Sequence, residues 1–391
     1  MSDYMPEEVI LKILNRLPVK SLLRFRSVCK SWNSLISHPS FISAHLQASL
    51  SNNNTPFLLI WSIERGIDRG RDNYSLHYDN DGFGKFRQLR FPLFDGVSGS
   101  SVVGSCNGLI CLQLYTPGDG LKFVLWNPLI QKYISLPRLT FFEADDLGIG
   151  FGFDSRTNDY KLIIVGFMGD YGSVANLYLF SLNQNCWKEV TAILPNYSFE
   201  PLYRRQLPFA NGAVHWFGYK ENNAGVCNYV ILGFDLSSEA TFVINLPESL
   251  TGFCPCELPI MKYGESSIAA SLTQVFGELH ELWVMKEYGV VESWTKVLTF
   301  TSHIQSRRIP RLLGFRKNGE VLMEVDNGKM TSFELNLQKI EPHAVEGVEV
   351  ATTPITHEAS YVESLVLLDK GVDTHSGSLV RTGKYIHLLF H

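Results

Sequence analysis

Few side chains in this sequence have types and spacing that could perform chemistry. The eleven histidines include no His-Glu-x-x-His motif and no pair at metal-ligand spacing, so no metal site is predicted. Cys254-Pro255-Cys256 is tighter than a Cys-x-x-Cys redox or zinc pair and has no second pair. Asp79-Asn80-Asp81-Gly82 begins like a calcium loop but lacks the glutamate expected near position twelve, which favours a hairpin turn.

Motifs for nucleotides and for nucleophilic catalysis are also missing. The glycine-rich segment 148–152 lacks the Gly-x-Gly-x-x-Gly spacing and no helical pattern follows it, so we interpret it as a turn between strands. No phosphate-binding loop and no Gly-x-Ser-x-Gly elbow occurs. Cys29 stands beside Lys30, which could lower the pKa of its thiol, but a structural role is the preferred interpretation. We therefore predict no cofactor and no catalytic residues, and that the protein is not an enzyme.

The composition describes a chain with a large, aromatic core. Of 391 residues, 45% are hydrophobic, 12% aromatic and 19% charged, which excludes disorder and favours β-structure. The net charge of -5 and the pI near 6.1 argue against nucleic-acid binding. No apolar run approaches ~18 residues and no secretory signal is visible, so neither a membrane span nor secretion is expected. Seven scattered cysteines fit a reducing compartment, and we expect a cytoplasmic or nuclear location.

The first fifty residues differ from the rest in charge and in periodicity. Six basic and three acidic side chains give this segment a net charge of +3, which leaves -8 for the remainder. Apolar positions at helical spacing and prolines predict three short helices, over about 6–17, 19–28 and 30–36, with Pro39 ending the third. Their apolar side chains outnumber what so small a unit can bury. The surplus predicts a partner, either the rest of the chain or another protein.

After residue 50 the pattern becomes one of many short strands. Strand-end residues recur at intervals of 48 to 54, and these markers are Tyr78, Trp126, Phe180, Phe234, Trp283 and Phe333. Asn-Gly turns precede several of the marker strands and favour hairpins. A period of ~50 residues with about four strands per unit predicts a β-propeller. We expect six blades, with seven as the alternative and an irregular pair of β-sandwiches as the competing fold.

Two features of this propeller can be predicted further. Residues 56–94 supply only about three strands, so a C-terminal strand near 361–368 is expected to complete that blade and remove two exposed edges. Four tryptophans at repeat-related places are expected to pack between blades rather than to form a ligand cage: Trp126, Trp216, Trp283 and Trp294.

An ordered set of short motifs in the first fifty residues resembles the F-box. The motifs are Met5-Pro6-Glu7-Glu8, Ile13-Leu14-x-Arg16-Leu17-Pro18, Leu22-x-Arg24-Phe25-Arg26-x-Val28-x-Lys30-x-Trp32 and Leu35-Ile36-x-x-Pro39-x-Phe41. The resemblance implies that this segment binds an acidic Skp-family adaptor and, through it, a cullin. The expected adaptor-binding residues are Met5, Pro6, Ile10, Ile13, Leu14, Leu17, Pro18, Leu22, Val28, Trp32 and Leu35.

The later repeats resemble the type 1 F-box-associated domain of plants. The resemblance rests on Ser105–Leu109, Leu125–Pro128, Gly150–Asp154, Asp159–Lys161, Asn211–Trp216 and Trp283–Lys296. That family includes S-locus F-box proteins and F-box/kelch-repeat proteins that restrain immune receptors. It implies an F-box at 1–45, a linker at 46–55 and a mainly β propeller-like domain at 56–391. The implied function is a non-catalytic receptor that recruits an unknown target protein for ubiquitination and proteasomal degradation.

Long turns that end equivalent strands are the expected target-binding surface. Unusually long turns fall near 64–73, 115–120, 168–175 and 220–227, and loops gathered on one face of a scaffold often bind partners. The candidate residues are Glu64, Arg65, Arg69, Arg71, Tyr115, Asp170, Tyr171, Lys220 and Glu221. Tolerated insertions are the competing interpretation. At the level of function, the alternatives are a propeller-type glycan-binding module or hydrolase with a helical cap, and an F-box protein that recruits nothing.

Overall fold

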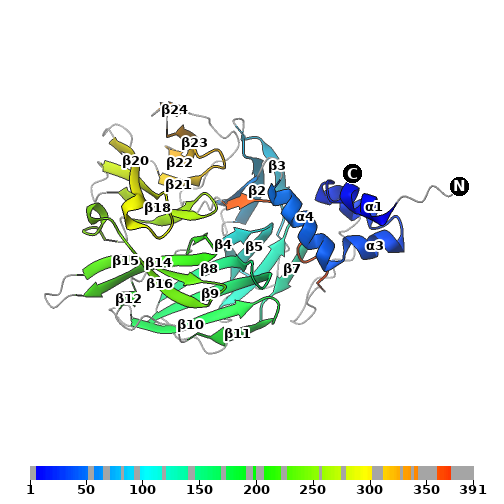
Figure 1. Cartoon of the computed structure of the whole chain (residues 1–391), viewed down its shortest axis with the longest axis horizontal. Helices are drawn as coiled ribbons and strands as arrows, with labels where there is room; N and C mark the ends of the chain where they lie inside the picture. The colour runs from blue at the N-terminus through cyan, green and yellow to red at the C-terminus, as the bar shows by residue number, and fades with distance from the viewer. Residues whose placement is uncertain are drawn as a thin grey trace.

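The computed structural model describes the chain from Pro6 to Lys370 with gaps between its elements. The described residues are 6–51, 57–64, 71–80, 83–91, 97–116, 120–139, 146–168, 173–190, 197–199, 207–221, 227–254, 258–273, 279–301, 311–325, 329–335, 339–341 and 359–370. Residues 6–51 form a helical unit at one end of the molecule, and strands make up most of the rest (Figure 1).

The N-terminal helical unit (residues 6–51) contains α1 (Glu7–Leu14), α2 (Val19–Phe25), α3 (Lys30–Ile36) and α4 (Pro39–Ser51). Pro6 and Pro18 occupy the positions just before α1 and α2, where the missing N–H of proline costs no helical hydrogen bond. Glu7 and Glu8 lie in the first turn of α1, at the positive end of the helix dipole. The first three helices confirm the pattern predicted from the prolines and the apolar spacing.

The fourth helix was not expected from the sequence, because Pro39 starts a helix here instead of ending one. The Nδ1 atom of His38 lies 2.7 Å from the Ser40 hydroxyl and accepts the Ser40 backbone N–H at 3.3 Å, so His38 caps the first turn. Phe41, Ile42, His45 and Leu46 are buried on one side of α4. Residues 46–51 of the predicted linker are consequently helical.

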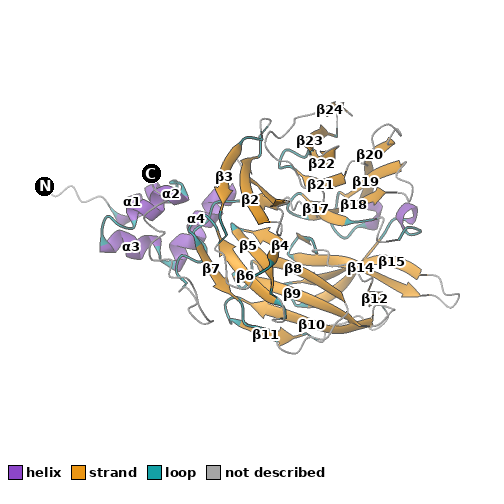
Figure 2. Ribbon diagram, turned by 180° about the vertical axis from the view of Figure 1, so that it is seen from behind, coloured by secondary structure: helices purple, strands orange, loops and turns teal. Residues whose placement is uncertain are grey.

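Six antiparallel sheets follow, and each is a blade of a propeller (Figure 2). Blade 1 contains β25 (Ala359–Tyr361), β1 (Phe57–Glu64), β2 (Arg71–Tyr78) and β3 (Lys85–Leu89). Blade 2 contains β4 (Gly99–Cys106), β5 (Leu109–Tyr115), β6 (Lys122–Asn127) and β7 (Lys132–Ser135). Blade 3 contains β8 (Asp146–Asp154), β9 (Asp159–Met168), β10 (Ser173–Ser181) and β11 (Cys186–Glu189).

The other three blades repeat this order. Blade 4 contains β12 (Ser198–Phe199), β13 (Phe209–Ala210), β14 (Ala213–Glu221), β15 (Cys227–Asp235) and β16 (Ala240–Asn245). Blade 5 contains β17 (Ile260–Tyr263), β18 (Ser267–Thr273), β19 (Leu279–Met285) and β20 (Trp294–Thr301). Blade 6 contains β21 (Arg311–Phe315), β22 (Val321–Val325), β23 (Lys329–Glu334) and β24 (Lys339–Glu341). A short 3-10 helix, Glu248–Leu250, lies between β16 of blade 4 and β17 of blade 5. Another, Val291–Ser293, lies between β19 and β20 of blade 5.

The first strand of each blade faces the centre of the ring. Contacts run from β25 to β4, from β4 to β8, from β8 to β13, from β13 to β17 and from β17 to β21. The ring closes where β25 pairs with β1, with Phe57 opposite Tyr361. This confirms six blades and a C-terminal closing strand. The strand is Ala359–Tyr361, however, and residues 364–368 form no strand, contrary to the expectation.

The sequence markers all fall at the ends of third strands, namely β2, β6, β10, β15, β19 and β23. The Asn-Gly turns join first to second strands, and Asn107 and Gly108 take φ of 52° and 79°. Segment 148–152, expected to be a turn, lies inside β8. A Cβ on Gly150 would lie 2.3 Å from Val214 Cγ1, and one on Gly152 would lie 2.3 Å from the Phe209 ring. The absence of a side chain at Gly150 and Gly152 therefore allows blade 4 to pack closely against β8.

Large apolar side chains fill the spaces between blades. Trp126 of blade 2 meets Tyr74 of blade 1 edge-on, with ring centroids 5.7 Å apart. Trp216 lies in one apolar cluster with residues of blade 3, and Trp294 lies in another with residues of blade 4. These three confirm the predicted packing. Trp283 is partly buried and also has Lys296 5.7 Å from the centre of its ring. The cluster that holds Trp126 extends into the helical unit, so blades 1–3 and the helices share a core.

Candidate interaction surfaces

In the described part of the chain, large exposed apolar side chains occur only in the helical unit. Within the described ranges, the large hydrophobic residues classed as exposed are Val9 (42%), Ile13 (47%), Val28 (63%) and Leu50 (42%). Val9 and Ile13 are four residues apart on α1, so they share one face of that helix. No large hydrophobic side chain of the described propeller residues is exposed to this extent. Unpartnered apolar surface of this kind marks a binding site.

The predicted adaptor-binding residues divide between the interior and the surface. Leu14 and Leu22 are buried and support the helices from within. Ile10, Leu17, Trp32 and Leu35 are partly buried against the same core. Exposed residues of the set are Pro6, Ile13, Pro18 and Val28. Met5 lies outside the described residues. Val9, which belongs to the apolar stripe of α1 in the sequence, is an additional exposed member of this surface.

The helical unit also exposes more basic than acidic side chains. Five of the six basic residues of the unit are exposed: Lys12, Arg16, Lys20, Arg24 and Lys30. The acidic side chains described in the unit, Glu7 and Glu8, are both exposed at the start of α1. The exposed part of the helical unit therefore combines apolar side chains with a net positive charge, which is complementary to an acidic partner.

The predicted target-binding turns occupy one structural position. They join the second to the third strand of a blade, and we call these connections the distal turns: 65–70, 116–121, 169–172, 222–226, 274–278 and 326–328. The helical unit enters at the opposite end of blade 1, because β1 begins at Phe57 and reaches its distal turn after Glu64. Eight residues of strand span about 26 Å. The distal turn of blade 1 and the helical unit therefore lie at opposite ends of that blade.

Only part of the predicted target-binding set can be placed. Tyr115, at the end of β5, donates a hydrogen bond to the Ser101 hydroxyl at 3.0 Å, and Lys220 is exposed at the end of β14. The backbones of Glu64, Arg71 and Glu221 also lie at strand ends next to distal turns. The remaining four, Arg65, Arg69, Asp170 and Tyr171, lie outside the described residues.

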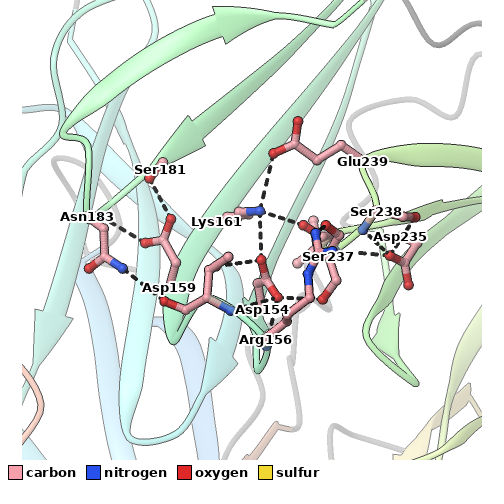
Figure 3. Close-up of polar contacts among 12 residues, drawn as sticks. Asp154, Arg156, Asp159, Lys161, Ser181, Asn183, Asp235, Ser237, Ser238 and Glu239 are labelled. Atoms are coloured by element: carbon pink, nitrogen blue, oxygen red, sulfur yellow. Dashed lines mark hydrogen bonds and ion pairs between the residues drawn. The ribbon is translucent and has the colours of Figure 1, made fainter.

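The most elaborate polar group in the propeller joins blade 3 to blade 4 (Figure 3). Asp154 accepts hydrogen bonds from Thr157 Oγ1 at 2.6 Å, from Lys161 Nζ at 2.9 Å and from the Ser237 hydroxyl. Lys161 Nζ also donates to the Leu236 carbonyl at 2.6 Å and to Glu239 at 3.3 Å. All three ammonium hydrogens therefore have acceptors.

The electrostatics of this group favour a structural role. Burial alone would raise the pKa of Asp154, but hydrogen bonds from Ser237, Thr157 and Lys161 outweigh it and hold the pKa well below its usual range. A carboxylate that stays ionised and hydrogen-bonded offers no proton and no free lone pair for catalysis. Asp159, which accepts hydrogen bonds from Ser181 and Asn183, is equally occupied. We find no catalytic geometry at this group.

Other blade junctions have polar bridges at the same end of the blades. Arg316 of blade 6 donates to Asp79 of blade 1 at 2.8 Å. His215 of blade 4 lies 2.6 Å from the Tyr288 hydroxyl of blade 5, and burial lowers the pKa of His215 to about 4. Asn127 of blade 2 donates to the Ser364 carbonyl at 3.0 Å. Two of these bridging residues have a signal in the sequence, because Asp79 and Asn127 each directly follow the aromatic marker of their blade.

Three further features of the described residues bear on chemistry. No group of three or more His, Cys, Asp or Glu side chains there could hold a metal ion. Among the helices placed by the structure, none is long and apolar enough to cross a membrane. Cys29 Sγ lies 3.1 Å from Ser31 Oγ, and this hydrogen bond lowers the pKa of the thiol.

Comparisons with known proteins agree with this architecture. A family model described as the F-box associated beta propeller domain matches residues 84–370, and one for the F-box domain matches residues 3–43. "F-box protein CPR1" of Arabidopsis thaliana is 28% identical, covering 94% of this chain and 89% of its own. "F-box/kelch-repeat protein At3g23880" of the same plant is 27% identical, covering 83% of this chain and 89% of its own. Among solved structures, TolB from Acinetobacter baumannii aligns with a TM-score of 0.39 and 11% identity, covering 76% of this chain and 67% of its own.

The propeller family model spans most of the chain, and the F-box model coincides with helices α1 to α3. F-box proteins are in general non-catalytic adaptor subunits, and an F-box in general implies an Skp-type adaptor as partner. The chain is a plant F-box protein with an F-box-associated β-propeller domain, and it belongs with the substrate receptors of that family.

Proposed function

We propose that this protein recruits a target protein to a Skp–cullin–F-box ubiquitin ligase. The helical unit binds the Skp-family adaptor, the propeller binds the target, and the chain itself performs no chemistry. Ubiquitination then follows from proximity, because a scaffold raises the local concentration of target lysines near the charged conjugating enzyme. The observation that carries the proposal is that, among the residues that the structure describes, the large exposed apolar side chains all lie in the helical unit.

The adaptor step can be tested with surface variants that leave the interior intact. Ile13→Asp places a charge on the exposed face of α1, and we expect at least a tenfold loss of affinity for a purified Skp-family adaptor. Leu50→Asp is the control, because Leu50 is similarly exposed but lies on α4, outside residues 3–43 that match the F-box model, whereas Val9, Ile13 and Val28 lie inside them. Calorimetric titration measures both variants. Equal affinity of wild type and Ile13→Asp would refute binding through this surface.

The target is proposed to bind the distal turns. These turns lie at the end of blade 1 opposite the helical unit, so a target bound there would leave the adaptor surface open. Asp72, beside the first distal turn, accepts hydrogen bonds from Ser100 and Trp61 and so supports the local structure. Lys220 and Asn228, which pair across β14 and β15, are exposed residues next to the distal turn of blade 4.

Shortened turns test this second step. Replacing residues 169–172 and 222–226 by Asn-Gly turns should preserve adaptor binding and the melting temperature but abolish capture of the target. Targets are identified first by proximity labelling in plant cells with the proteasome blocked. If the doubly shortened protein still captures and degrades them, the target site lies elsewhere on the propeller.

A further inference from the structure

The segment that follows the closing strand is buried without being a strand. After β25, residues 362–370 run as turns beneath the helical unit, and Figure 1 shows this orange-red segment beside α4. Tyr361, Leu365, Leu367 and Leu368 are all less than 5% exposed. They belong to the apolar cluster that contains Leu14, Val19 and Leu22 of the helical unit. The segment therefore lies between two parts of the molecule.

Polar contacts attach this segment to blade 2. The side-chain amide of Asn127 donates to the carbonyls of Ser364 at 3.0 Å and Val366 at 2.9 Å. Lys132 Nζ donates to the carbonyls of Leu368 and Lys370, each at 2.9 Å. A Cβ on Gly108 would lie 2.4 Å from the Ser364 hydroxyl, so the segment also packs tightly against the first turn of blade 2.

A single carboxylate attaches the same segment to the helical unit. The backbone N–H of Val19, the first residue of α2, lowers the pKa of Glu363, which places this carboxylate near the start of α2. That N–H has no partner within its own helix, and the positive end of the α2 dipole favours a negative charge there. Burial raises the pKa of Glu363, whereas the Val19 N–H and the charge of Arg87 oppose the rise. The helical unit also approaches blade 2, because the charge of Arg26 acts on Lys132.

We propose that segment 362–370 is a strap that holds the helical unit in one fixed orientation on the propeller, with Glu363 as its positioning residue. The unit is joined to β1 through only residues 52–56, and the strap continues from the strand that pairs with β1. The covalent connection and the strap thus hold the unit at two separate points, which restricts its rotation on the propeller. The orientation belongs to the chain alone and does not require that an adaptor binds.

The orientation can be measured on the full chain between two native cysteines. Cys29 of the helical unit and Cys186 of blade 3 are both exposed. Spin labels on these two, with the remaining cysteines replaced by serine or, where buried, by alanine, report their separation by double electron–electron resonance. We expect a single narrow distance distribution in the otherwise unchanged protein.

Charge reversal at the strap should release the unit. Glu363→Lys places a positive charge against the start of α2 and near Arg87, and we expect the distribution to widen at least twofold. Glu363→Gln keeps an oxygen acceptor for the Val19 N–H and should restore the narrow distribution. Glu292→Lys is the matched control, because Glu292 is exposed in a short helix of blade 5. An unchanged distribution in Glu363→Lys would overturn the proposal.

Hydrogen–deuterium exchange separates orientation from general unfolding. In Glu363→Lys, the amides of α2 should exchange faster while β8 to β11 of blade 3 keep their protection. Equal loss of protection in blade 3 would assign Glu363 to the stability of the ring and would equally overturn the proposal.

Discussion

At the scale of single residues, Asp154 shows how a buried charge can link two blades. Its carboxylate and the Lys161 ammonium have side-chain exposures of 0% and 6%, and hydrogen bonds from both blades surround them. Breaking a buried ion pair by removing one charge leaves the other uncompensated. We expect Asp154→Asn to lower the free energy of unfolding by about 3 kcal/mol at pH 7, as measured in urea.

The same residue makes a prediction about pH. The pKa of Asp154 is lowered by folding, so its contribution is complete above its unfolded value of about 3.9 and is lost progressively as the pH falls from that value through the lower pKa of the folded state. The stability difference between wild type and Asp154→Asn should therefore stay constant from pH 5 to pH 8. It should shrink below pH 4. A difference independent of pH down to pH 2 would contradict this assignment.

His215 provides a second, separate titration. Burial lowers its pKa to about 4, so the folded chain holds it neutral against Tyr288. Stability from this group is complete above the unfolded pKa of about 6.5 and declines by up to ~3 kcal/mol as the pH falls toward 4. We expect His215→Gln to remove this part of the pH dependence. Urea unfolding of both proteins at pH 7 and pH 5 measures it, and parallel declines would refute the role of His215.

At the scale of elements, the third strand of every blade could be predicted from sequence, because one aromatic marker ends each of them. The strand β8 could not be predicted, because its glycines look like a turn until the neighbouring blade is placed beside them. Helix α4 was missed because proline both ends and starts helices, and only the His38 cap decides between the two. The bridge between Asp154 and Ser237 was also invisible, since it joins residues that only the ring brings together.

The glycines of β8 give a prediction at this scale. Gly152→Ala would force the Phe209 ring away, and overpacking of this kind costs about 1–3 kcal/mol. Gly252→Ala is the control, because a Cβ there meets nothing within 4 Å. Thermal denaturation should show a lower melting temperature for the first variant only. Equal melting temperatures would mean that the Phe209 ring of blade 4 can move aside without a loss of stability.

At the scale of the whole molecule, the helical unit and blades 1–3 share one apolar cluster. Two parts that share a core unfold together, because exposing one exposes the other. We therefore expect calorimetry of the full chain to show no separate low-temperature transition for the helices. A distinct early transition, with far-ultraviolet loss of helix only, would show that the helical unit is an independent domain.

The pairing of β25 with β1 also has a consequence for synthesis on the ribosome. The first propeller strand to be synthesised is β1. Its partner strand is formed by residues 359–361, almost the last described part of the chain. Blades 2 to 6 are each built from one continuous stretch and can form in order during translation, but β1 keeps an open edge until the end. A premature stop codon before residue 359 would thus release a chain whose first blade remains open to aggregation and whose helical unit has lost the apolar side chains of residues 361–368 that pack against it.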